Sequence, residues 1–175
     1  MIGELLVIPF SKLHDADDPH SFIVKYNGVA VGIITDIGIA CEQVIQYFRQ
    51  CNAAFLEANY DEAMLAEGNY PYHLKKRISG GLGHLSNLQA AALFSEHKSQ
   101  GMSHLILSHL SKNNNTPKIV QDLFNQYAGT TEIIIASRYN ETGVYQINSS
   151  TTPVQTAILR RKTSANQKHL QLSMF

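Results

Sequence analysis

Residues 105–117 read LILSHLSKNNNTP, and they contain a strand, a polar loop and the start of a helix. The apolar run that ends at Ser108 is typical of a buried strand. Thr116 and Pro117 mark a helix start, because Thr caps free N–H groups and Pro suits the first turn. His109 therefore lies at the tip of a strand, where we expect it to belong to a metal site.

The composition indicates an ordinary globular protein. The chain has 175 residues, of which 44% are apolar and 16% charged, and its formal net charge is zero. This neutrality indicates no global attraction to nucleic acid or membrane, although a local basic patch is compatible with it. Cys41 and Cys51 match neither a disulfide framework nor a zinc ribbon, and no apolar run is long enough to cross a bilayer. We expect a cytoplasmic protein without membrane association.

Strand and helix patterns alternate along the chain. Strands are predicted at residues 4–10, 21–26, 29–35, 53–59, 104–108, 132–137 and 143–148. Helices are predicted at residues 39–50 and 59–68, at 87–98 with Asn87 as its cap, and from Pro117 onward. The pair Asn27-Gly28 predicts a tight hairpin. The alternation predicts an α/β or layered α+β domain over residues 1–148, followed by a polar tail at 149–175.

Polar side chains follow several of the predicted strands. His14 follows the first strand, Asp36 follows the third, Glu57 lies near the end of the fourth, and His109 follows the fifth. Strand ends in an α/β layer share one edge, and histidine nitrogen with carboxylate oxygen suits a divalent cation. His14, Asp36 and His109 are therefore candidate ligands. Each one alone is more typical of a structural or surface residue than of a ligand, and Asp36 could simply close a turn.

Two further segments carry candidate chemistry. His84 lies in SGGLGHLSN (79–87), where glycines let the backbone approach a ligand and a histidine could donate a proton or hold an anion. The same stretch also suits an ordinary linker before a capped helix. HLKKRI (73–78) is a basic patch that could meet a phosphate backbone, or it is a solvated helix face. The spacing of a phosphate-binding P-loop is absent.

The order of the motifs PFSKLHDADDP, GIITDIG, FLEANYDEAML, GHLSN and SHLSKNN resembles the C-terminal half of a metallo-β-lactamase-fold hydrolase, in particular the YycJ/WalJ-like subgroup. The resemblance covers roughly residues 5–148. It implies the C-terminal portion of a four-layered αβ/βα sandwich with a dinuclear metal site on one edge of its two sheets. The metals implied are two divalent ions, zinc or manganese.

The resemblance also implies roles for individual residues. His14 resembles a ligand of the first metal, Asp36 the aspartate that bridges both metals, and His109 the histidine of the second metal. His84 resembles the His-x-Thr element of ribonuclease Z-like relatives, where the histidine assists at the phosphate, and Glu57 would orient or buffer it. The implied reaction is hydrolysis by a metal-bound hydroxide, with a nucleic acid or a small phosphodiester as substrate.

The chain departs from the family in one large respect, since it has no HxHxDH motif. We therefore expect the three ligands present to bind metal weakly or not at all by themselves. The chain then corresponds to the C-terminal part of a metal-dependent hydrolase, completed by a longer gene product or an N-terminal partner segment. The alternative is a non-catalytic remnant or interaction module of the same fold, which would bury its open face in a homodimer.

Overall fold

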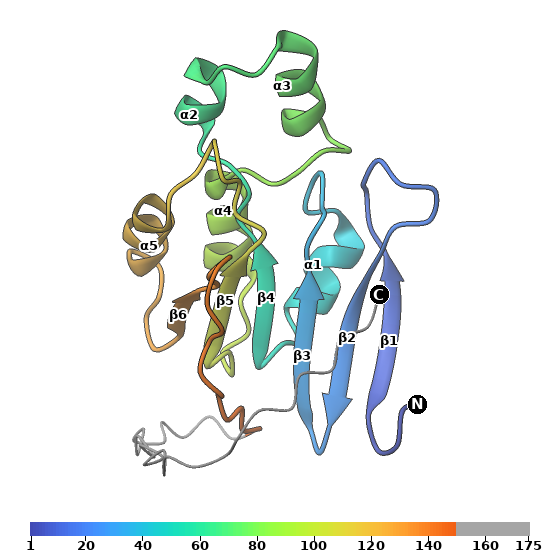
Figure 1. Ribbon diagram of the computed structural model, residues 1–175. Helices are drawn as coiled ribbons and strands as arrows, with labels where there is room; N and C mark the ends of the chain where they lie inside the picture. Colours follow the sequence, from blue (N-terminus) through green and yellow to red (C-terminus); the bar gives the residue numbers. More distant parts are fainter. Residues whose placement is uncertain (150–175) are drawn as a thin grey trace, which may run out of the picture.

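A six-stranded mixed sheet organises residues 1–149, which are the residues described by this computed structural model (Figure 1). The strands are β1 (Leu6–Ser11), β2 (His20–Tyr26), β3 (Val29–Ile34), β4 (Ala53–Glu57), β5 (His104–Ser108) and β6 (Glu132–Ile135). They lie in sequence order across the sheet. The first three strands are antiparallel, and β3 to β6 are parallel. The carboxyl ends of β1, β3, β4, β5 and β6 therefore meet at one edge.

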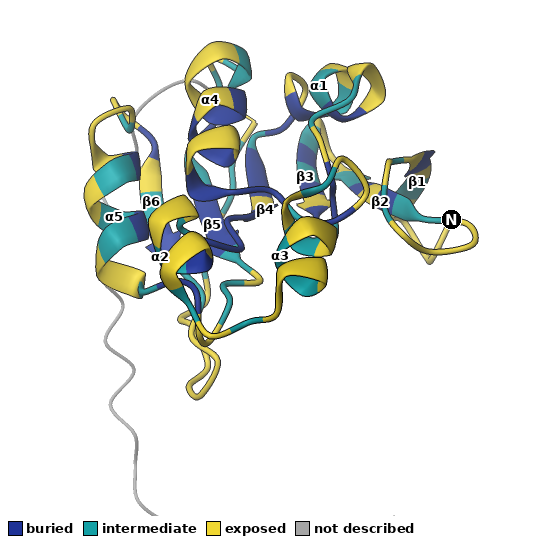
Figure 2. Ribbon diagram, turned by 90° about the horizontal axis from the view of Figure 1, so that it is seen from above, coloured by how far each residue is buried: buried dark blue, intermediate teal, exposed yellow. Residues whose placement is uncertain are grey.

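The helices lie on one side of the sheet and above that edge (Figures 1 and 2). They are α1 (Glu42–Phe48), α2 (Glu62–Glu67), α3 (Tyr72–Ser79), α4 (Asn87–His97) and α5 (Pro117–Asn125). Each parallel connection advances by one strand in the same direction, and right-handed crossovers then place their helices on a single face. The rings of Phe48, Phe94 and Phe124 are fully buried in the core there. Within residues 1–149, no helix is long and apolar enough to cross a bilayer.

The opposite face of the sheet is apolar but carries no helix. Phe22, Ile33 and Phe55 are paired across β2, β3 and β4, so their side chains share this face. Their exposed fractions are 39%, 41% and 39%. Farther along the sheet, the segment after β6 brings the Tyr145 ring within 5.6 Å of the His104 ring. We call the row Phe22, Ile33 and Phe55 the open face.

Most of the predicted elements are present. Each strand predicted before residue 138 ends within two residues of its expected bounds, and Thr116 caps α5 by accepting the N–H of Ile119. The Asn27-Gly28 turn has positive φ at both residues, as a type I′ hairpin requires. HLKKRI (73–78) lies on α3, which agrees with a helix face. Residues 150–175, nearly all of the predicted tail, lie outside the described residues.

Two of the predictions are wrong. Residues 143–148 are not a strand, because the chain after β6 turns past the sheet and does not pair with its edge. The cap of α4 is Ser86 and not Asn87. The Ser86 hydroxyl accepts the N–H of Gln89, and the Gln89 side chain accepts the N–H of Ser86. This reciprocal capping box leaves the side chain of Asn87 free to point into the protein.

The asparagines after β5 join three elements. The Asn115 amide donates to the carbonyls of Ala58 and Asn59 at 2.9 and 3.0 Å, just beyond the end of β4. It also exchanges two hydrogen bonds with the side chain of Asn87, at the start of α4. Both asparagines are buried, so the loop before α5 is fixed to β4 and α4.

We predict that Asn115→Ala lowers the free energy of unfolding by about 2–4 kcal/mol, because it leaves buried carbonyl and amide groups without partners. Urea denaturation followed by circular dichroism measures this change. The exposed neighbour Asn113 provides the control, and Asn113→Ala should change the free energy by less than about 0.5 kcal/mol. Equal effects of the two substitutions would contradict this account of the loop.

Candidate metal centre

One edge of the sheet gathers the polar residues that follow its strands. His14 comes after β1, Asp36 after β3 and His109 after β5, while Glu57 is the last residue of β4. Because β1, β3, β4 and β5 run in the same direction, these residues reach the same edge. The loop before α4 adds His84, whose ring lies 5.1 Å from that of His109 and 5.2 Å from that of His14. All five residues selected from the sequence are therefore neighbours.

The backbone is strained at two of these positions. Asp36 has φ of 56° and His109 has φ of 58°, in the left-handed region that L-residues seldom adopt. Asp and His tolerate this region better than most residues do, and each instance still costs roughly 1–3 kcal/mol. The two strands thus end in sharp turns that direct one carboxylate and one imidazole toward the same place.

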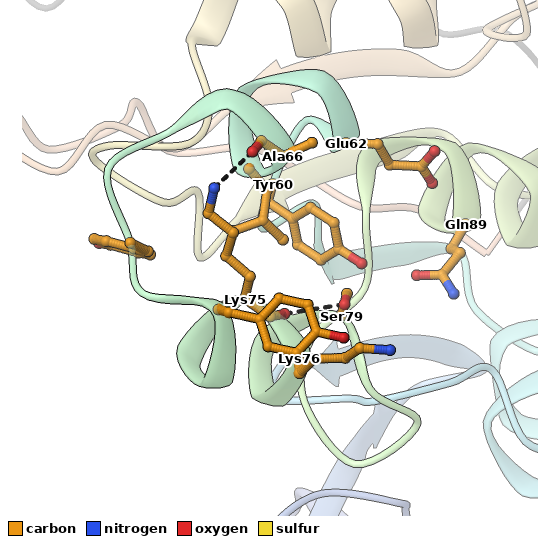
Figure 3. A pocket seen from close by; sticks show the side chains of 10 residues that line it. Tyr60, Glu62, Ala66, Lys75, Lys76, Ser79 and Gln89 are labelled. Carbon is orange, nitrogen blue, oxygen red and sulfur yellow. Dashed lines mark hydrogen bonds between the residues drawn. The ribbon is translucent and has the colours of Figure 1, made fainter.

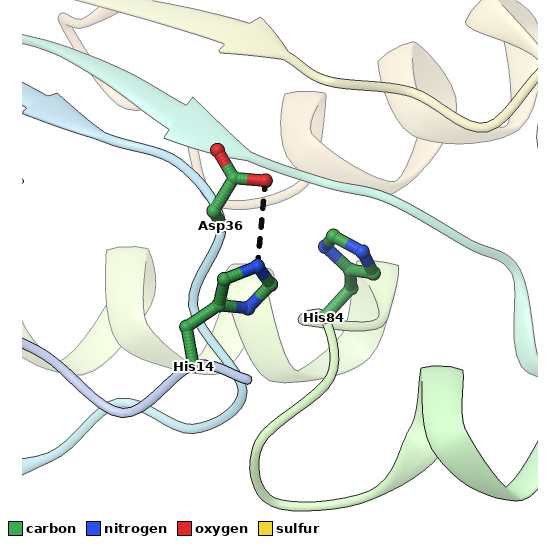
Figure 4. Close-up of side chains that lie close together, drawn as sticks. All are labelled: His14, Asp36 and His84. Carbon is green, nitrogen blue, oxygen red and sulfur yellow. Dashed lines mark ion pairs between the residues drawn. The ribbon is translucent and has the colours of Figure 1, made fainter. Parts of the chain in front are cut away.

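Asp36 lies between two histidines. Its Oδ1 atom is 3.8 Å from Nε2 of His14 and 3.6 Å from Nδ1 of His109. Figure 4 shows Asp36, His14 and His84 converging, and donor atoms of these three residues all lie within 4.8 Å of one another. Ligands of one tetrahedral zinc ion lie about 3–3.5 Å apart, given bonds of about 2.0–2.2 Å. The spacing around Asp36 needs only small adjustments to hold a cation.

Glu57 is a fully buried carboxylate with three hydrogen-bond donors. Its Oε1 atom lies 2.6 Å from Nδ1 of His84 and 3.1 Å from Nδ1 of His109. Its Oε2 atom accepts the backbone N–H of Ile37 at 2.9 Å. Burial alone would raise the pKa of Glu57, but the donors His109, His84 and Ile37 outweigh it and lower the pKa. The hydrogen bond to Glu57 raises the pKa of His109 despite partial burial.

These contacts fix which nitrogen each ring offers. An ionised carboxylate only accepts, so His84 and His109 donate N–H from Nδ1 to Glu57. Nδ1 of His14 lies 2.9 Å from the carbonyl of Gly83 and likewise donates, which leaves its Nε2 lone pair near Asp36. Hydrogen bonds of this kind orient histidines that ligate metals. The donor set therefore fits a borderline divalent cation such as zinc or manganese.

The structure forms two groups of possible ligands. One is His14, Asp36 and His84, and the other is Glu57, His84 and His109. His84 is common to both, so its placement suits a ligand as well as the proton donor expected from the sequence. Lys12 also lies beside the site, although it was not predicted from the sequence. Its ammonium group donates to the carbonyl of Thr35, and burial lowers its pKa. A lysine two residues before His14 gave no recognisable pattern.

Glycines let the loops of this edge approach each other. The N–H of Asp15 donates to the carbonyl of Leu82 at 2.9 Å, and that of Gly38 donates to the carbonyl of Leu13 at 2.7 Å. A Cβ atom on Gly38 would lie 2.1 Å from the carbonyl oxygen of Gly81. Of the glycines before His84, Gly83 is needed for a different contact, because a Cβ atom there would lie 2.1 Å from the carbonyl oxygen of Arg77 in α3.

Sequence comparison finds similar proteins. Exodeoxyribonuclease YycJ of Bacillus anthracis is 31% identical over 119 residues, which cover 68% of this chain and 45% of that protein. Exodeoxyribonuclease WalJ of Streptococcus pneumoniae is 29% identical over 127 residues, or 72% of this chain and 47% of that protein. The chain thus spans about half the length of the curated relatives it matches. No family model matches it.

Solved structures show the same architecture. The metallo-β-lactamase fold protein YhfI of Bacillus subtilis superposes with a TM-score of 0.58 at 15% identity, over 78% of this chain and 48% of that chain. Zn²⁺-bound PqqB of Methylobacterium extorquens superposes with a TM-score of 0.53 at 14% identity, over 77% of this chain and 49% of that chain.

The fold defines the class: this chain has a metallo-β-lactamase fold, built on its six-stranded sheet. Its sequence is similar to the YycJ and WalJ exodeoxyribonucleases over about 70% of this chain, which confirms the resemblance seen in the sequence.

We predict that Gly38→Ala separates the loops around His14 and His84 and lowers the free energy of unfolding by about 1–3 kcal/mol. Gly81→Ala is the matched control, because a Cβ atom there meets only an ordinary contact at 3.7 Å. Urea denaturation of both variants measures the difference. A loss in Gly38→Ala no greater than in Gly81→Ala would show that the close approach contributes nothing.

Proposed function

We propose that this chain provides one side of the active site of a divalent-metal-dependent phosphodiesterase that cleaves DNA. The observation that supports this most directly is the buried carboxylate of Glu57, which holds His84 and His109 beside Asp36. The names of the curated relatives, both exodeoxyribonucleases, favour DNA over other phosphodiesters. Those relatives are about twice as long as the part matched here, so the complete reaction is assigned to the complete fold.

His14, Asp36 and His109 would hold the metal ions. Nε2 of His14 and Oδ1 of Asp36 face each other, and Asp36 also lies beside the His109 ring. His109 would offer its Nε2 atom, because its Nδ1 donates to Glu57. Zinc is favoured because nitrogen and carboxylate donors suit it and because PqqB, of the same fold, is described as zinc-bound; manganese suits the donors as well. Bound divalent cations activate water and neutralise the charge that develops on phosphate oxygens.

His84 would supply the proton for the leaving group. As phosphorus gains a bond to the oxygen of water, that water releases one proton to solvent. The bond from phosphorus to the leaving nucleoside oxygen breaks, and that oxygen takes the proton from Nε2 of His84. Glu57 accepts the N–H of Nδ1 throughout, so it orients the ring with Nε2 directed away from the carboxylate. The buried Glu57 is thus a positioning residue, and His84 is the group that touches the substrate.

We further propose that the open face is covered by a second β-layer, as in a four-layered αβ/βα sandwich. Phe22, Ile33 and Phe55 form a continuous apolar row on the face that carries no helix. Such a row favours burial against another apolar layer. Additional residues of a longer chain would supply that layer, and in their absence a second copy of this chain would.

We predict that the purified chain binds Zn²⁺ weakly in isothermal titration calorimetry. Asp36→Asn should weaken this binding at least tenfold further, because it removes the negative charge of the carboxylate between His14 and His109. Asp17→Asn is the control on the exposed loop after β1 and should leave the affinity unchanged. His84→Gln should keep the affinity within a few-fold but lower metal-dependent cleavage of a labelled single-stranded oligonucleotide by about 10²–10⁴-fold.

Two results would change these assignments. A loss of Zn²⁺ affinity in His84→Gln as large as that in Asp36→Asn would make His84 a ligand. Metal binding without any cleavage by a protein that contains the complete fold would instead favour a non-catalytic module, the alternative interpretation of the sequence.

We also predict that the isolated chain dimerises through its open face. Light scattering after size-exclusion chromatography should give twice the 19.5 kDa of the monomer, and Phe55→Lys should restore the monomer because it places a charge in the apolar row. The control Tyr127→Lys, at the end of α5, should leave the dimer intact. A wild-type chain that stays monomeric at high concentration would contradict this use of the face.

A further inference from the structure

A cavity of about 630 Å³ lies between α2, α3 and the start of α4 (Figure 3). Its walls include three tyrosines and two lysines: Tyr60, Tyr70, Tyr72, Lys75 and Lys76. In Figure 1, α2 and α3 stand above the carboxyl ends of the strands, on the same side as the candidate metal centre. The metal centre does not use these five residues, so the cavity needs a separate explanation.

The cavity and the metal centre share two backbone segments. Tyr60 comes three residues after Glu57, and its carbonyl accepts the N–H of Asn87 at 2.8 Å. Tyr60 also forms a β-bridge with Ser86, two residues after His84. Three residues of extended chain span at most about 10 Å. The backbone of the cavity wall at Tyr60 therefore lies within about 10 Å of that of Glu57.

A third contact joins the cavity to the loop of His109. The hydroxyl of Tyr70 accepts a hydrogen bond from the Asn113 amide at 3.0 Å. Asn113 lies in the loop that follows His109, so the cavity rim is connected to both sides of the metal centre. A ligand that extends from the cavity toward the metals would pass along protein surface all the way.

The basic residues of α3 differ in what they are free to bind. The Arg77 guanidinium is paired with Asp15 at 2.6 Å, and the Lys75 ammonium donates to the carbonyl of Ala66 at 2.6 Å. Among the described residues, Lys76 has no carboxylate partner, and its ammonium lies 5.7 Å from the centre of the Tyr72 ring. Lys76 and Tyr72 therefore present a cation beside an exposed aromatic face, which suits a phosphate next to a base.

The inner wall of the cavity contains the aromatic ring of Tyr60 and the polar groups of Tyr60 and Gln89. Tyr60 is almost fully buried, and no described residue forms a hydrogen bond with its hydroxyl. Burial raises the pKa of this phenol, which keeps it a neutral donor. The Gln89 carbonyl is used by the N–H of Ser86, so its amide NH₂ remains available to a ligand. A flat aromatic ligand with hydrogen-bonding edges matches this lining.

We infer that this cavity binds an unpaired nucleobase of the DNA strand being cleaved, with the adjoining phosphate at Lys76. This inference rests on the proposed function, because it places the next phosphate of the same strand at His84. A paired base would have to leave its duplex first, and its unpairing and unstacking cost free energy in any such enzyme. The cavity therefore selects single-stranded ends over blunt duplexes.

Binding is measured without cleavage, by fluorescence anisotropy of the full chain with a chelator and a labelled oligothymidylate. We expect the single strand to bind more tightly than a blunt duplex of the same length. Tyr72→Ala and Lys76→Ala should each weaken single-strand binding about fivefold or more. Tyr72 is 73% exposed, so its removal leaves folding intact. The controls Tyr127→Ala and Lys118→Ala, both on the α5 side of the molecule, should change nothing.

Three outcomes would overturn the inference: equal affinity for single strand and duplex, no effect of either α3 variant, or no binding of the single strand at all. The same binding measurement is repeated with thymidine monophosphate in place of the oligonucleotide. If this nucleotide binds and the binding is lost in both variants, the occupant is a free nucleotide. That result would overturn the proposal that a DNA strand occupies the cavity. Failure of the proposed function is distinguishable from failure of this inference. In that case the single strand binds and both variants weaken the binding, but metal-dependent cleavage is absent.

Discussion

The buried carboxylate of Glu57 is the constraint on which this edge of the molecule depends. A charged group without water is costly, and here His84, His109 and the N–H of Ile37 offset that cost. Those three donors come from the loops after α3, β5 and β3, respectively. A single side chain at the end of β4 thus fixes the relative positions of three loops, and removal of any donor would leave a buried charge less satisfied.

The order of the strands explains why the two faces of the sheet differ. Every parallel connection from β3 to β6 advances one strand in the same direction, so the crossover helices accumulate on one face. The core around Phe48, Phe94 and Phe124 forms there, while Phe22 and Phe55 face outward on the other side. A layered sandwich has the same requirement, because its two sheets meet on the faces that their own helices leave free.

The proposed chemistry and the proposed base-binding cavity would be adjacent, because both would use the same two segments of chain. Residues 57–60 carry Glu57 at one end and Tyr60 at the other, and residues 84–86 carry His84 and then Ser86, which bridges to Tyr60. A shift in either segment would move the proton donor and the cavity wall together. This coupling would keep a bound base and the reacting phosphate at a constant distance from each other.

The sequence by itself determined the strands, the hairpin, the cap at Thr116 and the presence of His14, Asp36 and His109 at strand ends, because such patterns depend on neighbours a few residues away. Only the tertiary structure decided that Glu57 is shared by two histidines, that Asn115 is buried and that residues 143–148 leave the sheet. These features join residues 27 to 57 positions apart, or depend on where the chain turns after its last strand. No local pattern records such contacts, since burial and charge pairing are set by the packing of distant segments.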